Sequence, residues 1–355
     1  MNDSSTKLGE HTARVNIECF VPPRCPHRDC ASNVSATPFR HRRHGHFVRK
    51  CDGRRVPRFR CLICSRGFSS QSFRLDYRLR RPQLLTQLFE LFVSKVTLRQ
   101  ASRIVGAHLD TVALHQRRLG EHCRRLQYAL IRTSPAPTET PVRRIAFDEL
   151  ETFEGSRIRR PVTAAVTVDA DALFIYDLEV GKLPQRGSKQ APQGNGKAAE
   201  TTRRSGSRRA VRAALRRTAA SLPAGSEVVV VSDKKTTYPN AIKRAFGARC
   251  LRHIRVDSKA PRTPRNPLFP ANLTLAMLRD GVSRLVRRSW AHSKHRGRLR
   301  LHLWIWVVWR NWHRPRTVRE PQSSAAMAAG LAKSRLPISS LLGWHGRFEE
   351  LIASR

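Results

Sequence analysis

The feature that most constrains this sequence is a run of four valines, Val228 to Val231, which leads through Ser232 into Asp233. An uninterrupted run of β-branched residues is typical of a strand that is buried on both faces of a sheet. Such a strand needs a packed layer above it and another below it. The run therefore predicts the centre of an α/β domain.

Strands and helices are expected to alternate on both sides of this run. The expected strands are 144–148, 162–168, 173–180, 227–233 and 251–256, and the expected helices are 211–222, 238–246, 273–289 and 299–312. The turn residues 169–172 predict a hairpin between the second strand and the third. This order of elements matches that of ribonuclease-H-like domains, so we expect a mixed sheet. The spacing of Trp304, Trp306, Trp309 and Trp312 favours core packing over base stacking.

The charge of the chain is strongly unbalanced. Its 355 residues include 68 Lys and Arg but 26 Asp and Glu, which gives a formal net charge of +42. Such a charge repels itself unless a polyanion neutralises it, so nucleic acid is the expected partner. We expect no membrane partner, because residues 1–16 lack the apolar core of a secretory signal. The longest apolar run, 303–309, is also far shorter than the roughly 20 residues that span a bilayer.

The composition changes along the chain and predicts a multidomain α/β protein. The expected segments are a zinc ribbon at 15–80, an all-α helix-turn-helix domain at 83–131, a proline-rich linker at 132–141, a mixed-sheet catalytic domain at 142–314 with a basic loop at 182–207, and a tail at 315–355. Forty per cent apolar residues are enough to build packed cores in these segments.

Cysteines are concentrated in the first of these segments. Eight cysteines are too few to staple a chain of 355 residues, so we interpret them as thiols or metal ligands. Two close pairs, one with spacing C-x4-C and one with C-x2-C, match the four soft ligands that zinc takes at tetrahedral corners. The expected zinc ligands are Cys25, Cys30, Cys61 and Cys64. Cys51 and His27 are the replacement ligands, and ordinary free thiols are the alternative interpretation.

The second segment contains the pattern of a helix-turn-helix. Thr97 and Gln100 match a capping box at the start of a first helix, and Gly106 permits the turn that follows. Asp110 is the expected N-cap of a second helix that would enter the major groove of DNA. The first helix is expected to bury Ala101, Ile104 and Val105, and the second to present Thr111, His115, Arg117 and Arg118 to DNA. A helical hairpin with a solvated basic face is the alternative.

Acidic residues are scarce in this chain, so their positions are informative. Asp148 and Asp233 each follow the apolar part of an expected strand, and carboxylates at the ends of adjacent strands can share Mg²⁺ or Mn²⁺. Two such ions activate the attacking oxygen and stabilise the leaving oxygen in phosphodiester chemistry. The alternative is that both are turn or cap residues, with Asp148 in a solvated acidic loop beside Glu149, Glu151 and Glu154.

Six runs of residues carry a resemblance to a known family. They are 59–69 (FRCLICSRGFS), 146–153 (AFDELETF), 232–238 (SDKKTTY), 266–272 (NPLFPAN), 278–285 (LRDGVSRL) and 288–294 (RSWAHSK). Together they resemble bacterial insertion-sequence transposases of the DDE superfamily that combine a zinc ribbon, a helix-turn-helix and a ribonuclease-H-like catalytic domain. The stretch from 266 to 294 is the most specific part of the resemblance.

This resemblance implies a DNA transposase that binds the ends of an insertion element and catalyses metal-dependent strand cleavage and strand transfer. Asp148 and Asp233 would be its first and second catalytic acids. Its partner would be double-stranded DNA, both element ends and target, and a homo-oligomer would bring two ends together. Its location would be the prokaryotic cytoplasm, at the nucleoid. The alternatives are a non-catalytic DNA-binding regulator, a catalytically decayed transposase and a structural RNA-binding protein.

The third catalytic acid of the family is missing from this sequence. Between Asp233 and Glu320 there is no Glu, and the remaining carboxylates are Asp257 and Asp280. The position of the family's Glu corresponds here to Asn272, at the edge of the buried face of the expected helix, whereas Asp280 points nearly opposite. We expect Asn272 to be the third ligand, and a helix N-cap is its alternative role.

Basic residues continue along this helix and past its end. Those expected to contact DNA phosphates are Arg284, Arg288 and Lys294, with Arg279, Arg287 and Arg296 beside them. The shortage of Glu residues to pair with them favours DNA contact over a merely solvated face.

Overall fold

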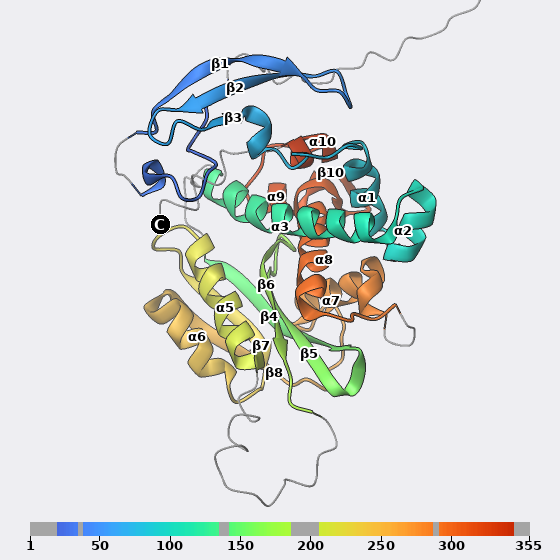
Figure 1. The fold of residues 1–355 in the computed structure, drawn as a ribbon. Helices are drawn as coiled ribbons and strands as arrows, with labels where there is room; N and C mark the ends of the chain where they lie inside the picture. Colours follow the sequence, from blue (N-terminus) through green and yellow to red (C-terminus); the bar gives the residue numbers. More distant parts are fainter. Residues whose placement is uncertain (1–19, 35–37, 135–141, 186–205, 287–290, 344–355) are drawn as a thin grey trace, which may run out of the picture. The chain divides into compact units, whose positions relative to one another are not determined.

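The computed structural model describes residues 20–34, 38–134, 142–185, 206–286 and 291–343 (Figure 1). These residues fall into two compact units, 20–82 and 83–343, and each unit is considered by itself. Within the described ranges, no helix is both long enough and apolar enough to cross a membrane.

The smaller unit is built on a three-stranded antiparallel sheet. Its elements are η2 (Ala31–Asn33), β1 (His41–Val48), β2 (Arg55–Cys61), β3 (Gly67–Ser69) and η3 (Ser70–Phe73). The core of this unit is small and consists of Cys25, Cys30, Phe59, Cys61 and Phe68, with Phe20, Phe39, Cys64 and Phe73 packed against it. Four of these nine residues are cysteines, so little apolar area is available to hold the unit together without a metal.

The larger unit contains a five-stranded mixed sheet, as the sequence predicts. Its strands are β4 (Arg143–Glu154), β5 (Ser156–Asp169), β6 (Ile175–Lys182), β7 (Val228–Asp233) and β8 (Cys250–Val256), in the order β6-β5-β4-β7-β8. The strands β4, β5 and β6 pair antiparallel, whereas β7 pairs parallel with β4 and with β8. This topology is consistent with a ribonuclease-H-like domain.

Helices cover both faces of the sheet (Figure 1). On one face lie α5 (Gly206–Ser221) and α6 (Tyr238–Phe246), and the 3-10 turn η4 (Gly247–Arg249) follows α6. Thr167 of β5 is hydrogen-bonded to Thr218 of α5, and Phe147 of β4 contacts the Tyr238 ring of α6. Side chains alternate along a strand, so Ala146 faces the other way. There it packs with residues at the start of α7 (Phe269–Gly281), which is followed by η5 (Ser283–Leu285).

The other helices of this unit form a layer around α8 (Arg296–Val308). They are α1 (Leu84–Val93), α2 (Leu98–Val105) and α3 (Leu109–Thr133). The long helix α3 runs close to α8, and a Cβ atom added at Gly120 would lie 2.6 Å from the carbonyl oxygen of Leu301. The chain ends with η6 (Trp309–His313), β9 (Pro315–Thr317), β10 (Glu320–Ser324), α9 (Ala325–Ala328) and α10 (Ile338–Gly343). Trp304, Trp306 and Trp312 are fully buried, which confirms their expected role in core packing, whereas Trp309 is half-buried.

Both ends of the helix that follows the last strand of the sheet differ from the sequence-based prediction. The helix expected at 273–289 begins four residues earlier, at Phe269, and ends at Gly281. A Cβ atom at position 281 would overlap the indole nitrogen of Trp306, so the close approach of α8 requires glycine there. Most of the basic loop expected at 182–207, and residues 135–141 of the expected linker, lie outside the described residues.

Candidate functional site

The four expected zinc ligands come together in the smaller unit. The Sγ atoms of Cys25, Cys30, Cys61 and Cys64 all lie within 4.8 Å of one another. Two of the Sγ–Sγ distances, Cys25–Cys64 and Cys30–Cys61, are 3.7 Å. Four thiolates at a Zn–S distance of about 2.3 Å stand about 3.8 Å apart at the corners of a tetrahedron, so this cluster has the dimensions of a zinc site.

The replacement ligands are engaged elsewhere. Cys51 is exposed and its thiol contacts the carbonyl of Leu79, while Nε2 of His27 lies 3.4 Å from the carbonyl oxygen of Gly67. Each cysteine pair lies around a tight turn, here called a knuckle. In the second knuckle, which carries Cys61 and Cys64, the Cys61 N–H donates to the Arg66 carbonyl, and the Ile63 N–H points at Sγ of Cys61. The cluster therefore uses the four cysteines without either substitute.

Hydrogen bonds within the knuckles favour the thiolate form of one ligand. Burial raises the pKa of Cys64, but hydrogen bonds from the backbone and guanidinium of Arg66 outweigh it and lower this pKa to about 6. The same guanidinium donates to Asp29, 2.6 Å away, and so connects the two knuckles. Burial raises the pKa of Cys25 in the same cluster, so a bound metal ion would be needed to hold all four cysteines as thiolates.

The sheet of the larger unit brings Asp148 and Asp233 to the same level. The parallel pairing of β4 with β7 ends at Ala146 and Val231, and each aspartate lies two residues further along its strand. Ala146 and Val231 pack against Leu268 and the α7 residue Ala271. Because side chains at positions i and i+2 share a face, both carboxylates project on the side that α7 covers.

The expectation that Asp148 ends its strand is wrong, because β4 continues to Glu154. Residues 145–153 pair continuously with β5, which supplies hydrogen-bond partners after β7 has diverged. Asp148 therefore stands inside a long hairpin, just past the point where the parallel pairing stops. The alternative of a solvated acidic loop is also wrong.

The pKa of Asp148 is raised to about 6, mainly because the carboxyl is buried. The negative charges of Asp233 and Glu149 raise it further, while a hydrogen bond from the Glu149 N–H lowers it. The influence of Asp233 indicates that the two carboxylates are close enough to interact. Oδ1 of Asp233 accepts a 3.0 Å hydrogen bond from the Lys235 N–H. A bound divalent cation would relieve the repulsion between two such carboxylates.

Asn272 lies in the first turns of α7 and is not its N-cap. The helix begins at Phe269, and Oδ1 of Asn266 accepts from the Leu268 N–H just before it, while the Asn272 N–H donates to the Leu268 carbonyl. The preceding residue, Ala271, packs on the residues two positions before the aspartates. Asn272 is half-buried, and no hydrogen bond to its side-chain amide is found among the described residues.

The two other candidate acids are exposed. The side chain of Asp280 is 88% exposed and pairs with Lys95, and it stands eight residues beyond Asn272, about 12 Å along the helix axis. Asp257 pairs with Lys234 in solvent. In the described part of the chain, no third carboxylate, His or Cys joins Asp148 and Asp233 in a metal-sized cluster.

One group beside the aspartates was not expected from the sequence. Glu149, whose side chain is 6% exposed, faces α5 and α6. It accepts 2.6 Å hydrogen bonds from Ser207 and Tyr238 and pairs with the ammonium of Lys235. Lys235 thus holds Asp233 through its backbone and Glu149 through its side chain. A lysine two residues after Asp233 is the signal in the sequence that could have revealed this connection.

The helix-turn-helix pattern is present in part. Thr97 and Gln100 form the expected capping box, and Gly106 adopts a left-handed conformation in the turn. The N-cap of α3, however, is His108, whose Nδ1 accepts from the N–H of Asp110. Asp110 is therefore the second residue of the helix and does not cap it.

Two expected orientations on these helices are wrong. Ile104 is 62% exposed, and His115 is 3% exposed. The reason is that α3 extends for 25 residues and packs along α8, which buries the His115 side of the helix. Thr111 and Arg117 are exposed, and Arg117 pairs with Glu121, while Arg118 is half-buried.

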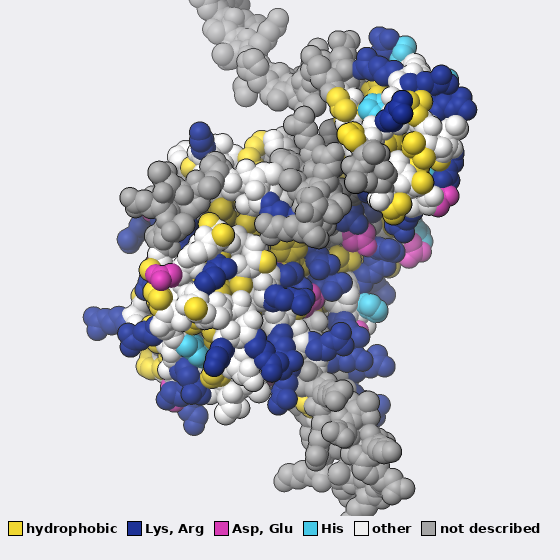
Figure 2. All heavy atoms as spheres, turned by 90° about the vertical axis from the view of Figure 1, so that its left-hand side faces the viewer, with side chains coloured by type: hydrophobic (Ala, Val, Ile, Leu, Met, Phe, Trp, Pro, Cys, Tyr) yellow, Lys and Arg dark blue, Asp and Glu magenta, His cyan; other side chains and the backbone are white. Residues whose placement is uncertain are grey.

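The basic residues expected after α7 differ in accessibility. Arg284 is half-buried and donates to Gln116 of α3, and burial together with the charge of Arg298 lowers its pKa to about 10. Lys294 is exposed and contacts His292. Arg288 lies outside the described residues. Figure 2 shows Lys and Arg side chains at many places on one face of the molecule and few Asp or Glu side chains.

Comparison with known proteins does not assign this chain to a family. No family model matches the chain, and no curated protein matches it. Among solved structures, the catalytic domain of Mos1 mariner transposase aligns with 55% of this chain and 85% of its own length, at 14% identity and a TM-score of 0.26. A likeness of this size does not decide the function.

Proposed function

We propose that this protein is a DNA transposase of the DDE type, which binds the ends of an insertion element and catalyses strand cleavage and strand transfer. The observation that carries the proposal is the register of β4 with β7, which sets Asp148 level with Asp233 on the face covered by α7. Asn272, one residue after the contact made by Ala271, completes the set. The same register argues against a structural RNA-binding protein, which has no need of paired carboxylates.

In this proposal Asp148, Asp233 and Asn272 hold Mg²⁺ or Mn²⁺. When bound, such ions lower the pKa of the attacking hydroxyl and stabilise the charge on the leaving oxygen. Cleavage is attack of a water oxygen on phosphorus, with loss of the 3′-oxygen as a free hydroxyl. Strand transfer is attack of that 3′-hydroxyl on a phosphodiester of the target.

The residues around the aspartates would position them for this chemistry. The Glu149 N–H donates to Asp148, and the Lys235 N–H donates to Asp233, so each carboxylate is fixed from its own strand. The smaller unit, with Zn²⁺ on its four cysteines, and the N-terminal part of α3 would contact double-stranded DNA at the element ends. A homo-oligomer would hold two ends together.

A catalytically decayed transposase, or a DNA-binding regulator derived from one, is the second candidate. One observation favours it, namely the neutral amide of Asn272 at the third ligand position. A regulator of this kind would keep the cysteine cluster and the basic surface and would bind element ends without cutting them.

A nicking assay separates the two candidates. The purified full chain is incubated with Mg²⁺ or Mn²⁺ and a plasmid that carries the sequences flanking its own gene. We expect nicking by the wild type, a loss of at least 100-fold in Asp148→Asn and Asp233→Asn, and no loss in Asp280→Asn, which removes one exposed acid from the same helix as Asn272. Equal nicking by Asp233→Asn and the wild type would refute the proposed site, and no nicking by the wild type would favour the regulator.

A further inference from the structure

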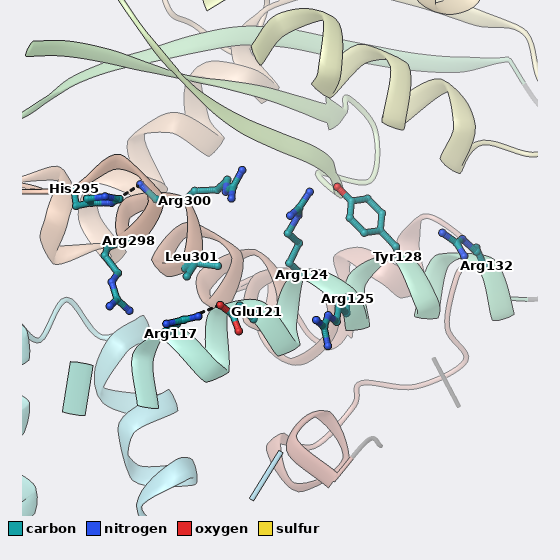
Figure 3. A pocket seen from close by; sticks show the side chains of 11 residues that line it. Arg117, Glu121, Arg124, Arg125, Tyr128, Arg132, His295, Arg298, Arg300 and Leu301 are labelled. Carbon is teal, nitrogen blue, oxygen red and sulfur yellow. Dashed lines mark hydrogen bonds and ion pairs between the residues drawn. The ribbon is translucent and has the colours of Figure 1, made fainter. Parts of the chain in front are cut away.

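A basic groove runs between α3 and α8 in the larger unit (Figure 3). It encloses about 820 Å³ and is lined by six arginines, Arg117, Arg124, Arg125 and Arg132 from α3 and Arg298 and Arg300 from α8. From Arg117 to Arg132 the groove follows α3 for about 22 Å, at 1.5 Å per residue. This length suits an extended chain of phosphates rather than a single small anion.

The acidic groups near the groove do not neutralise it. Glu121 is the acid in its lining and pairs with Arg117, and Glu179 of β6 pairs with Arg300. The lining thus holds six arginines and Glu121. A groove with this excess of positive charge attracts a polyanion and repels another basic surface.

Two arginine nitrogens in the groove lack partners. Nη1 of Arg298 and Nε of Arg300 are buried and have no hydrogen-bond partner among the described residues. A buried charged donor without an acceptor is costly, so an anion in the groove that draws these two guanidinium groups towards it would relieve that cost. Phosphate oxygens are suitable acceptors for guanidinium groups.

The position of the groove connects it with the paired aspartates. At its end near His295, the N–H of Arg296 donates to Glu154, and the N–H of Gly155 donates to Ser293. The start of α8 is therefore fixed to the tip of the β4–β5 hairpin, six residues from Asp148. Six residues of strand span about 20 Å. On B-DNA, about 20 Å corresponds to about six nucleotides at 3.4 Å each.

We propose that this groove binds the phosphodiester backbone of the DNA strand on which the Asp148 and Asp233 site acts, about six nucleotides from the reacting phosphate. The inference rests on the proposed function for its choice of DNA. Figure 3 shows the side chains of Arg124 and Arg300 extending into the space between the two helices, where they would flank such a strand.

The test measures the salt dependence of DNA binding by the full chain. The variant is Arg124→Gln with Arg298→Gln, and the matched control is Arg209→Gln with Arg216→Gln, two exposed arginines of α5 that do not line the groove. Fluorescence anisotropy with a 30-base-pair duplex gives Kd at several NaCl concentrations. Each lost phosphate contact should reduce the slope of log K against log salt by about 0.9, so we expect a reduction of about 1.8 and about tenfold weaker binding.

Three further outcomes keep the test decisive. Arg124→Lys with Arg298→Lys should retain most of the slope, because the charge remains, and its thermal melt should match that of the Gln variant. Equal slope losses in the α5 control would overturn the groove as a defined site. Displacement of the duplex by polyglutamate or by RNA at equal or lower concentration would overturn DNA as its occupant.

The failure of this inference is distinguishable from the failure of the proposed function. Asp233→Asn should bind the duplex with an unchanged slope, since its side chain lies outside the groove. If the wild type binds DNA through the groove but never nicks it, the catalytic proposal fails and the groove stands. If the wild type nicks DNA while the groove variant binds and nicks as well as the control does, the groove fails and the catalytic proposal stands.

Discussion

The side chain of Asn272 sets the metal affinity expected of the candidate site. An amide oxygen is neutral, whereas a carboxylate attracts a divalent cation with a full charge and can bind it with two oxygens. We therefore predict that Asn272→Asp lowers the Mg²⁺ concentration for half-maximal nicking about tenfold, which equals about 1.4 kcal/mol of binding free energy. Asn272→Ala should raise it.

A Mg²⁺ titration of nicking checks this prediction. Asp280→Asn serves as the control, because it changes an exposed carboxylate of the same helix that pairs with Lys95. An unchanged Mg²⁺ requirement in Asn272→Asp would mean that residue 272 does not contact the ion.

Several residue positions could be predicted from the sequence and others could not. The cysteine pairs and the two aspartates were found because their spacing, or their place after an apolar run, is itself the requirement of the chemistry. The burial of His115 and the exposure of Ile104 depend on which side of α2 and α3 meets other helices. Helical periodicity shows which face of a helix carries the most apolar side chains, but it does not show against which face a neighbouring helix packs.

Two buried histidines join the helices of the larger unit. Nε2 of His122 in α3 lies 2.7 Å from the Leu341 carbonyl of α10, and Nε2 of His302 in α8 lies 2.8 Å from the Phe92 carbonyl of α1. Burial lowers the pKa of His122 to about 4 and that of His302 to about 3. Both are neutral in the folded state and take up a proton on unfolding below their ordinary pKa.

The two histidines should therefore lower the stability as the pH falls from about 6.5 towards 4, because the unfolded state protonates them and the folded state does not. Asp148 and Asp177 act in the opposite direction, because burial raises the pKa of each to about 6. At pH 5 the loss is on the order of 2 kcal/mol for each histidine. Urea unfolding at pH 7.5 and pH 5 measures it: between these two pH values, His122→Gln with His302→Gln should lose less stability than the wild type loses. An equal pH dependence in the double variant and the wild type would assign it to other groups.

The contact between α3 and α8 depends on one glycine. A Cβ atom at position 120 would lie 2.6 Å from the Leu301 carbonyl oxygen, and backbone cannot move aside as a flexible side chain can. We predict that Gly120→Ala lowers the free energy of unfolding by about 2–3 kcal/mol, although alanine favours an isolated helix. Gly343→Ala, at a position with open space, should change it by less than about 0.5 kcal/mol. Equal values for the two variants in urea unfolding would contradict the packing argument.

The positions of the strands in the sheet could be predicted from the sequence better than the residues at which the elements end. Apolar runs located all five strands and their hairpin, because burial in a sheet leaves a continuous signal. The second half of β4 was missed since its alternating Glu residues looked like a solvated loop, and its hydrogen bonds come from β5. The early end of α7 was missed for a similar reason, because the indole of Trp306 approaches Gly281 from a distant part of the chain.

The two units of the protein differ in what holds them together. The smaller unit relies on four cysteines and a few phenylalanines, while the larger unit has a sheet covered on both faces and three fully buried tryptophans. Metal binding supplies the folding free energy of small metal-held domains. Removal of zinc should therefore unfold the smaller unit and leave the larger one folded.

Tryptophan fluorescence distinguishes the two units, because all six tryptophans of the chain lie at position 290 or beyond. We predict that a zinc chelator releases one equivalent of Zn²⁺ and opens the region before residue 83 to proteolysis, with no change in tryptophan emission. Cys64→Ser should show the same proteolysis without chelator, whereas Cys51→Ser, at the exposed cysteine outside the cluster, should behave as the wild type. A shift in tryptophan emission on chelation would mean that the metal stabilises both units, and the larger unit could then not be treated as an independent fold.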